Sequence, residues 1–332
     1  MHMFKNLIIS KFIAASIVAS ASTIAAPFPE QKIGESPWGA DDELGRLNYM
    51  NPEYQTSLMI RADWSKIYDL SVEYFIGMPS WQAVGDPQYQ IWMTHTPKGS
   101  VVDNVLNVGE KVNSHVSYTG SAISMYTHTG THIDALNHFG LDGKIYNNFS
   151  AEKHLGDKGW HKTGAETIPP IVARGVLIDI PKAKNLEMLE DNYRVTKEDI
   201  QSALQKQGVK LAQGDVVLIR TGRMKIYEDS QKYMNNSPGL GMEASIYLAN
   251  QGAMIVGSDN LSFESFPSEV DGNYVPVHTF LLAQNGIPII ELANLETLST
   301  DEVYEFAFIG SSLKLRGADA APLRPIAIPL KN

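Results

Sequence analysis

Three histidines and one aspartate fall within residues 128–138, in the order His128, His132, Asp134 and His138. The residues between them include threonine, glycine and isoleucine, which are poor helix formers, so we predict an extended chain here. Side chains alternate between the faces of a strand, so His132 and Asp134 point the same way with their Cα atoms about 7 Å apart. Both side chains are therefore placed to bind one ion.

The separation of His128 and His132 requires a bend. A straight strand would hold their Cα atoms about 13 Å apart, whereas a ligand bond is only about 2 Å long. Gly130 lies at the midpoint and permits a bulge or a positive φ without steric cost. Two imidazoles and one carboxylate with open coordination positions suit Zn²⁺ or Mn²⁺ holding a water, which loses its proton near neutral pH and becomes a nucleophile.

His138 is the natural proton-handling group beside such a water. Its ordinary pKa of about 6.5 suits it to act first as base and then as acid. The alternative is that these histidines are structural or solvated, because the chain contains nine histidines and some clustering is expected by chance. Four ligand-type residues interleaved with glycine and threonine favour the metal site.

The pattern His128-x-Gly130-Thr131-His132-x-Asp134-x3-His138 resembles the signature of the cyclase family of metal-dependent hydrolases, which includes bacterial kynurenine formamidase and isatin hydrolase. The sequence departs from the usual signature at Leu136, where the family carries proline, and this position binds no metal. Further blocks resemble the longer branch of the family, so the resemblance covers most of the chain from about residue 36. These blocks are residues 38–45, 215–222, 257–259 and 276–278.

The resemblance implies a role for each matching residue. His138 would be the catalytic acid/base, and a later histidine and carboxylate of the family correspond to His278 and Glu291. Whether those two bind a second ion or support the first is left open, so we expect one or two ions of Zn²⁺ or Mn²⁺. The implied metal ligands are His128, His132 and Asp134, with His278 and Glu291 as the later pair.

Glu291 lies within an apolar run, residues 287–292, that reads as a strand, and it follows a helix predicted for residues 276–285. An unpaired carboxylate in such a strand is costly, so Glu291 requires a partner. A metal ion is one partner, and an arginine is the alternative. The candidates are Arg220, Arg316 and Arg324.

Composition is typical of an enzyme that acts on small molecules. A chain of 332 residues with 43% hydrophobic content can bury a large core, and no low-complexity tract divides it, so we predict one hydrolase domain over residues 27–332. The net charge of −10 argues against nucleic acid or an anionic membrane surface as a partner. The absence of cysteine excludes thiolate catalysis. We also expect a homo-oligomer, a dimer or a tetramer.

The first 26 residues have the features of a secretory signal peptide. A positively charged start precedes a short apolar run that ends in small residues. We expect cleavage, no stable membrane anchor afterwards, and a periplasmic or secreted bacterial enzyme. The alternative is an uncleaved anchor, although the apolar run is only a marginal span.

After residue 170 the sequence alternates strands and helices. Strands are predicted at 172–180, 215–220 and 253–257, with helices at 196–207 and 243–251. This pattern supports a mixed α/β fold. The resemblance implies a single domain with a central β-barrel-like mixed sheet surrounded by helices, of the swivelling β/α/β type.

Two further motifs have competing readings. Residues 239–244 match G-x-G-x-x-A, with Asp259 twenty residues after the first glycine, as in a dinucleotide-binding loop. The polar segment 228–237 before it is unlike a buried strand, so we favour a loop that leads into a helix. Asp259 instead ends a predicted strand, where α/β enzymes place polar groups, and is a candidate substrate-binding residue together with Phe139.

The sequence therefore predicts hydrolysis of a carbon–nitrogen amide bond by a metal-activated water, with His138 as acid/base. The expected substrates are an N-formyl or aryl amide such as N-formylkynurenine, or a lactam such as isatin. The alternatives are a metal-dependent lactone or ester hydrolase and a non-catalytic, metal-dependent small-molecule binding protein. A serine hydrolase is disfavoured because no G-x-S-x-G motif occurs.

Overall fold

Four parallel strands form the centre of the main sheet. In space they follow the order β7 (Ile171–Asp179), β9 (Val216–Arg220), β11 (Ile255–Ser258) and β12 (Ile289–Glu291). Every residue of β9, β11 and β12 is buried. Strands covered on both faces are expected to be continuously apolar, which explains why these segments lack the alternation of a half-exposed strand.

Antiparallel strands extend this centre at both ends. On the β7 side lie β13 (Glu305–Gly310), β15 (Ile326–Pro329) and β1 (Tyr68–Asp69), and on the β12 side lie β4 (His132–Asp134) and β14 (Ala320–Pro322). The result is a nine-stranded mixed sheet, curled into an open half-barrel. The predicted α/β fold with a barrel-like sheet core is therefore confirmed.

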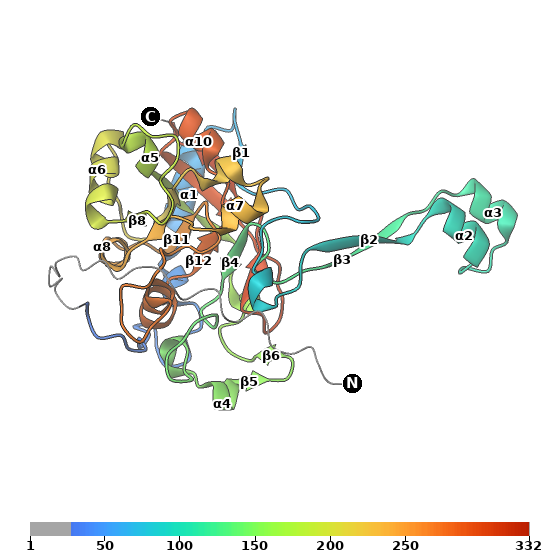
Figure 1. The fold of residues 1–332 in the computed structure, drawn as a ribbon, viewed down its shortest axis with the longest axis horizontal. Helices are drawn as coiled ribbons and strands as arrows, with labels where there is room; N and C mark the ends of the chain where they lie inside the picture. The colour runs from blue at the N-terminus through green and yellow to red at the C-terminus, as the bar shows by residue number, and fades with distance from the viewer. Residues whose placement is uncertain (1–27, 332) are drawn as a thin grey trace, which may run out of the picture. The chain divides into compact units, whose positions relative to one another are not determined.

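Helices surround the sheet in the computed structural model, which describes residues 28–331. Figure 1 shows α6 (Lys197–Gln207) and α8 (Met242–Asn250) together on one side of the strands. Thr196 and Asp199 cap α6 reciprocally, and Gly208 ends it in the left-handed conformation. No helix among residues 28–331 is long and apolar enough to cross a membrane. The predicted signal peptide lies outside the described residues, so the boundary at residue 26 stays a prediction.

The remaining elements are short. The helices are α1 (Pro52–Arg61), α2 (Pro97–Asp103), α3 (Glu110–His115), α4 (Ala151–His154), α5 (Ile180–Ala183), α7 (Ser230–Met234), α9 (Pro276–His278), which continues as a π-helix over Thr279–Gln284, and α10 (Glu296–Thr300). The strands outside the main sheet are β2 (Gln90–His95), β3 (Gly120–Ser124), β5 (Leu155–Gly156), β6 (Gly159–Trp160), β8 (Arg194–Val195) and β10 (Gly239–Leu240).

The glycine motif at residues 239–244 does not form a dinucleotide-binding unit. Its first two residues are the short strand β10, which pairs with β8 outside the main sheet. The next residue, Gly241, is the N-cap of α8. The segment leads into a helix, as predicted. No strand of the main sheet directly precedes it, whereas a dinucleotide-binding loop would follow such a strand.

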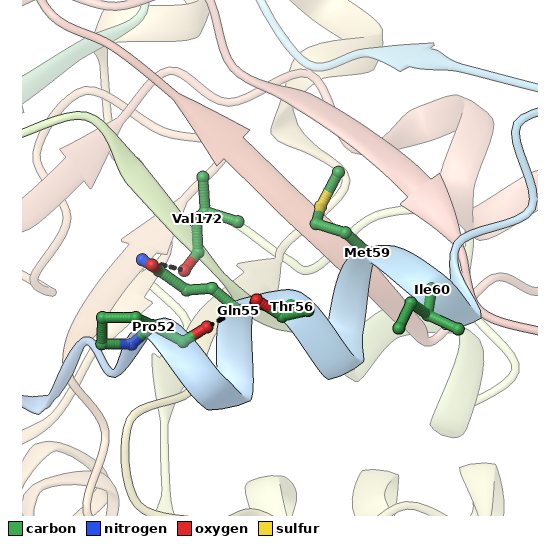
Figure 2. Close-up of a pocket in the computed structure, with 6 residues that line it drawn as sticks. All are labelled: Pro52, Gln55, Thr56, Met59, Ile60 and Val172. Atoms are coloured by element: carbon green, nitrogen blue, oxygen red, sulfur yellow. Dashed lines mark hydrogen bonds between the residues drawn. The ribbon is translucent and has the colours of Figure 1, made fainter.

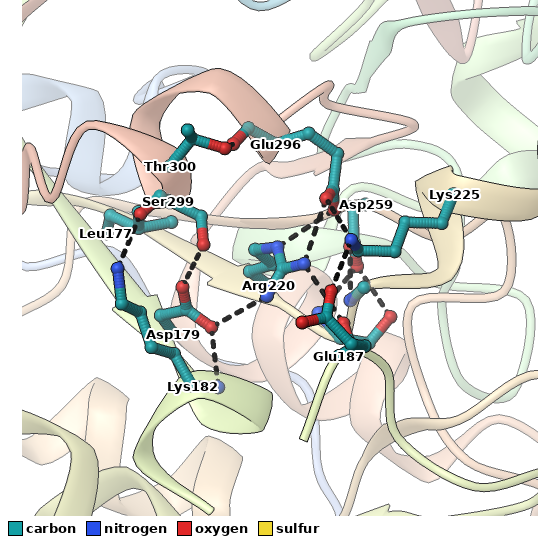
Figure 3. A network of polar contacts seen from close by, with 12 residues as sticks. Leu177, Asp179, Lys182, Glu187, Arg220, Lys225, Asp259, Glu296, Ser299 and Thr300 are labelled. Atoms are coloured by element: carbon teal, nitrogen blue, oxygen red, sulfur yellow. Dashed lines mark hydrogen bonds and ion pairs between the residues drawn. The ribbon is translucent and has the colours of Figure 1, made fainter. Parts of the chain in front are cut away.

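A buried ionic network joins β7, β9 and α10 (Figure 3). Arg220 donates to the Asp179 carboxylate at 2.9 Å and to both oxygens of Glu296 at 2.8 and 2.9 Å. The Arg220 and Asp179 side chains are only 4% and 1% exposed. Ser299 also donates to Asp179. The network therefore fixes the ends of two central strands against a helix.

Replacement of Arg220 by leucine should lower the free energy of unfolding by about 3–5 kcal/mol, because Asp179 would remain buried without its cationic partner. The matched control is Arg324→Leu. Arg324 is 80% exposed and pairs with Asp69 at 2.7 Å, and loss of such a surface pair changes stability by about 0–1 kcal/mol. Urea unfolding of both variants measures the difference, and equal losses would contradict this account.

Candidate metal centre and active site

A sharp turn precedes β4 and brings His128 back toward the strand. Gly130 adopts φ +65°, and the carbonyl oxygens of Thr129 and Thr131 accept hydrogen bonds from the Tyr74 hydroxyl at 2.9 and 3.4 Å. The Thr131 hydroxyl donates to the Leu292 carbonyl at 2.6 Å, which ties the turn to the end of β12. The predicted bend at Gly130 is confirmed.

The register of the sheet assembles the site from three strands. In β4, His132 lies opposite Glu291 of β12 on one side and Pro322 of β14 on the other. The Ala135 amide donates to the Asp319 carbonyl at 2.9 Å, directly before β14. Residues separated by more than 150 positions in the sequence therefore converge on β4.

Asp134 is the centre of the cluster. Its Oδ1 lies 2.9 Å from Nδ1 of His128 and 3.3 Å from Nε2 of His132. Its Oδ2 lies 4.0 Å from Nε2 of His278. Glu291 completes the group, 3.3 Å from Nε2 of His132 and 3.5 Å from Nε2 of His278. The structure thus brings together all five predicted metal ligands.

Four of these ligand atoms have no hydrogen-bond partner among the described residues: Nε2 of His128, Nε2 of His132 and both carboxylate oxygens of Asp134. The two histidines and Asp134 are at most 2% exposed. Buried polar atoms are costly without a partner. Imidazole nitrogens and carboxylate oxygens that converge without hydrogen-bond geometry fit a divalent cation, so the donor set is suited to hold one.

Carboxylates and imidazoles shift each other's pKa within the cluster. Burial alone would lower the pKa of His132, but the nearby charged carboxylates of Asp134 and Glu291, each 3.3 Å from its Nε2, raise this pKa to about 10. Burial would raise the pKa of Asp134, yet the neighbouring His128 and His138 hold it well below its usual range. Carboxylates that hold a proton on a buried imidazole equally attract a metal cation, which replaces that proton on binding.

Hydrogen bonds behind the cluster orient two of its histidines. Nδ1 of His278 lies 2.6 Å from a Glu264 oxygen, and Nδ1 of His132 lies 2.7 Å from the Gly130 carbonyl. Glu264 also accepts the backbone amides of Val277 and His278 at 3.2 and 3.0 Å. These contacts turn Nε2 of both rings toward Asp134 and Glu291, as outer partners of metal-binding histidines do.

His138 lies at the edge of the cluster. Its ring centroid is 4.0 Å from that of His128, and its Nδ1 lies 3.6 Å from the Asp319 carboxylate. Its side chain is 15% exposed, whereas that of His132 is fully buried. Burial and the charge of His128 lower the pKa of His138, so its ring is neutral at neutral pH and able to accept a proton.

Aromatic rings surround this edge. The Phe139 ring centroid lies 4.3 Å from that of His138 and 5.1 Å from that of His278. Tyr126 stacks against His128 at 4.8 Å, and Tyr274, which is 73% exposed, lies 6.3 Å from Phe139. Phe139 thus lies beside His138 and His278, and its role as a pocket residue that binds substrate stays a prediction.

The Asp259 carboxylate accepts hydrogen bonds from neighbouring residues in the protein interior. One of its carboxylate oxygens accepts hydrogen bonds from the Thr221 amide and hydroxyl at 2.8 and 2.7 Å, and the other accepts one from the Gly222 amide at 2.8 Å. The residue is completely buried. Its predicted role in substrate binding finds no support in these contacts, which fit a structural role at the end of β11.

Glu291 has no arginine partner among the described residues. Arg220 is bound to Asp179 and Glu296, and Arg324 is bound to Asp69. Glu291 instead faces His132 and His278. Of the two alternatives drawn from the sequence, the metal cluster is the one that the structure supports.

A separate groove of about 540 Å³ runs along α1 (Figure 2). The residues that line it have no ionisable side chain, and Gln55 bridges to the Val172 carbonyl at 3.2 Å. This surface offers no acid, base or metal ligand. The lining residues are Pro52, Gln55, Thr56, Met59, Ile60 and Val172.

Two residues of the site were missed by sequence reasoning. Asp319 precedes a short strand at the far end of the chain, 3.5 Å from Nε2 of His128. Burial would raise the pKa of Asp319, but the nearby imidazoles of His128 and His138 hold this pKa far below its usual range. In the sequence, nothing distinguishes Glu264 from other acidic residues in loops. Neither carries a local signal, since only the sheet register and the tertiary fold bring them to the histidines.

Comparison with known proteins places the chain in a family. The family model described as putative cyclase matches residues 68–265, more than half of the chain, so this protein belongs to the cyclase family. The resemblance drawn from the motif is therefore confirmed. The matched segment includes residues 128–138 and Glu264, whereas His278, Glu291 and Asp319 follow it.

Individual relatives agree with this assignment. Kynurenine formamidase of Bacillus cytotoxicus is 26% identical over 272 residues, which cover 82% of this chain and 100% of that protein. A crystal structure of a novel cyclase superposes with a TM-score of 0.77 at 28% identity, over 90% of this chain and 100% of the other. Isatin hydrolase A from Ralstonia solanacearum shares the fold, with a TM-score of 0.60 at 20% identity over 80% and 92% of the two chains.

Gly130→Ala should lower the free energy of unfolding by more than the cost of a positive φ, because the added Cβ would also clash with Tyr74. A Cβ at Gly130 would lie 2.4 Å from Cζ of Tyr74. The matched control is Gly143→Ala, where φ is +71° and no atom lies within 4 Å. We expect a loss of about 1–2 kcal/mol for Gly143→Ala and a further loss of about 1–3 kcal/mol for Gly130→Ala. Urea unfolding tests this, and an equal loss would refute the close contact.

Glu264→Gln should weaken metal binding by roughly 10- to 100-fold, because His278 loses its charged partner. Competition with a chromophoric chelator measures the affinity. The control is Glu43→Gln, since Glu43 also binds a lysine and a backbone amide, at 2.7 and 2.8 Å, but belongs to another segment. An unchanged affinity in Glu264→Gln would show that Glu264 only caps α9.

Proposed function

We propose that this protein is a metal-dependent amidohydrolase that cleaves a carbon–nitrogen amide bond in a small molecule. The observation that carries the proposal is the buried set of converging, unpartnered ligand atoms, with the neutral and partly exposed His138 beside it. The favoured substrates are an N-formyl or aryl amide such as N-formylkynurenine, or a lactam such as isatin. The similarity to a kynurenine formamidase over that protein's whole length supports this class.

His128, His132 and Asp134 would hold the ion, with His278 and Glu291 as further ligands. A bound divalent cation supplies Lewis acidity, which polarises a carbonyl and lowers the pKa of water. We propose Zn²⁺ or Mn²⁺, since imidazole and carboxylate ligands suit both. Asp134 belongs to two of the ligand triads, so the site accepts one ion or two, and metal analysis gives the number.

His138 performs the proton transfers in this proposal. As a neutral ring it takes a proton from the attacking water and returns it to the departing nitrogen. Asp319, 3.6 Å from Nδ1 of His138, stabilises the imidazolium formed between these two steps. An amine leaves poorly without a proton, so a histidine positioned to deliver one favours amide over ester cleavage. Phe139 supplies a flat apolar wall for the acyl or aryl group.

We also propose that the enzyme is exported after cleavage near residue 26, from the composition of the N-terminal segment. The lack of cysteine is compatible with this, since the chain has no thiol that an oxidising compartment would modify. N-terminal sequencing of the protein recovered from the producing cell tests this proposal.

The test of function combines metal analysis with hydrolysis assays on N-formylkynurenine and isatin, before and after chelation. We expect one or two equivalents of Zn or Mn and activity that the chelator abolishes. His132→Ala should lose metal and activity together, whereas His138→Ala should keep the metal and lose about 10²- to 10⁴-fold in kcat. His115→Ala, an exposed histidine outside the cluster, serves as the control.

Each result has a defined meaning. Normal turnover by His138→Ala would overturn its assignment as acid/base. Bound metal with turnover of lactones or esters only would replace the amide proposal with an esterase. Bound metal without turnover of amides, lactams, lactones or esters would leave a binding protein. A protein that neither contains nor takes up metal would refute the metal-dependent function.

A further inference from the structure

A further group of candidate metal ligands lies beside the candidate metal centre and shares one residue with it. It consists of His128, His138 and Asp319, whose ligand atoms all lie within 4.8 Å of one another. His128 also belongs to the centre, whereas His138 is the proposed acid/base and Asp319 binds no ion in the function proposed above. This group is called the outer triad.

The spacing of the outer triad fits a cation better than it fits direct hydrogen bonds. Oδ2 of Asp319 lies 3.5 Å from Nε2 of His128 and 3.6 Å from Nδ1 of His138. A hydrogen bond between nitrogen and oxygen is about 2.7–3.2 Å long, so both contacts are too long. Ligand atoms that lie about 2.1 Å from a tetrahedral Zn²⁺ ion are about 3.4 Å apart, which is close to the observed spacing.

Nε2 of His128 gives independent evidence for a ligand at this position. The His128 side chain is only 3% exposed, and this nitrogen has no hydrogen-bond partner among the described residues. A buried polar atom without a partner is costly. A cation that takes the lone pair of this nitrogen would therefore stabilise the arrangement.

The Asp319 carboxylate is held in place by its other groups. Its Oδ1 accepts a hydrogen bond from the Thr127 hydroxyl at 3.0 Å, and its backbone carbonyl accepts one from the Ala135 amide at 2.9 Å. These contacts come from both sides of the histidine motif. They position Oδ2 beside His128 and His138 without the need for a hydrogen bond to either ring.

The outer triad should bind a cation more weakly than the centre does. It contains one carboxylate, whereas the centre contains two, those of Asp134 and Glu291. The Asp319 and His138 side chains are 36% and 15% exposed, while Asp134 is fully buried. Fewer charged ligands and easier access of water both lower affinity. The outer triad would therefore fill only when metal exceeds the amount that the centre takes up.

An ion on the outer triad would occupy the electron pair that His138 uses in the proposed reaction. A neutral imidazole has one nitrogen that can accept a proton, so a ring bound to metal through that nitrogen cannot act as a base. His128 is subject to the same limit. Its Nδ1 lies 2.9 Å from Asp134 and its Nε2 lies 3.5 Å from Asp319, so the outer triad competes with the centre for this ring.

We propose that the outer triad is an additional, weaker cation site through which excess Zn²⁺ inhibits this enzyme. The inhibition rests on the proposed function, because it requires His138 to be the acid/base. The binding of the ion does not rest on it, since the three ligands can hold Zn²⁺ whether or not the protein hydrolyses an amide.

Equilibrium dialysis of the purified holoenzyme against Zn²⁺ tests the site by counting bound ions. The wild type should bind one equivalent at least 10-fold more weakly than the ions of the centre. Asp319→Asn, which is nearly isosteric and uncharged, should lose this weak equivalent and keep the tight ones, whose retention also shows that the variant is folded. Asp301→Asn is the matched control, because Asp301 is 31% exposed and pairs with Lys66 instead of a histidine.

Two further measurements complete the test. Glu291→Gln removes a ligand of the centre, so it should leave the weak equivalent in place. Turnover is compared, for each variant, between stoichiometric and excess Zn²⁺, so each variant is its own reference. The Zn²⁺ concentration for half-inhibition should rise roughly 10-fold or more in Asp319→Asn, because even an outer partner of a ligand contributes roughly 10- to 100-fold in affinity.

A wild type without a weak equivalent would overturn the proposal, as would a weak equivalent that Asp319→Asn retains. Loss of the weak equivalent in Glu291→Gln alone would assign that ion to the centre and refute the outer triad. An Asp319-dependent equivalent that leaves turnover unchanged would refute the inhibition. Absence of turnover under all conditions would contradict the proposed function, while the dialysis result would still decide whether the outer triad binds an ion.

Discussion

The burial of Asp134 is the constraint on which the rest of the structure depends. Its two carboxylate oxygens lie in the interior and accept no hydrogen bond from any described residue. Such a carboxylate is tolerated only where opposite charge surrounds it. Histidines from the Gly130 turn, from β4 and from α9 surround this carboxylate, and the same donor atoms suit a divalent cation. The position of β4 between β12 and β14 makes this convergence possible.

The sheet supports the site through two kinds of contact. The parallel strands provide an apolar base buried on both faces, while the Arg220 network fixes the ends of β7 and β9. Hydrogen bonds from Tyr74 and Thr131 hold the turn before β4 in place. A metal site needs this rigidity, because ligands that move apart lose affinity for the ion.

The sequence predicted those parts of the molecule that local chemistry determines. The apolar runs and capping residues identified β7, α6, β9 and α8 within one or two positions. Likewise, spacing and glycine content located the turn and the shared face of His132 and Asp134. Glu264 and Asp319 were not predicted, because their roles depend on strand register and on contacts across the fold. Asp259 was assigned to substrate from its place at a strand end, but backbone amides already satisfy it.

The hairpin of residues 90–124 and the candidate metal site are adjacent in the chain. Strand β3 ends at Ser124, and within four residues the chain passes Tyr126 and reaches His128. The Tyr126 amide donates to the Pro87 carbonyl at 3.2 Å and closes the base of the hairpin, while its ring stacks on His128. The base of the hairpin therefore contacts His128, a candidate metal ligand, through Tyr126. The hairpin and the candidate site thus share the short segment that joins Ser124 to His128.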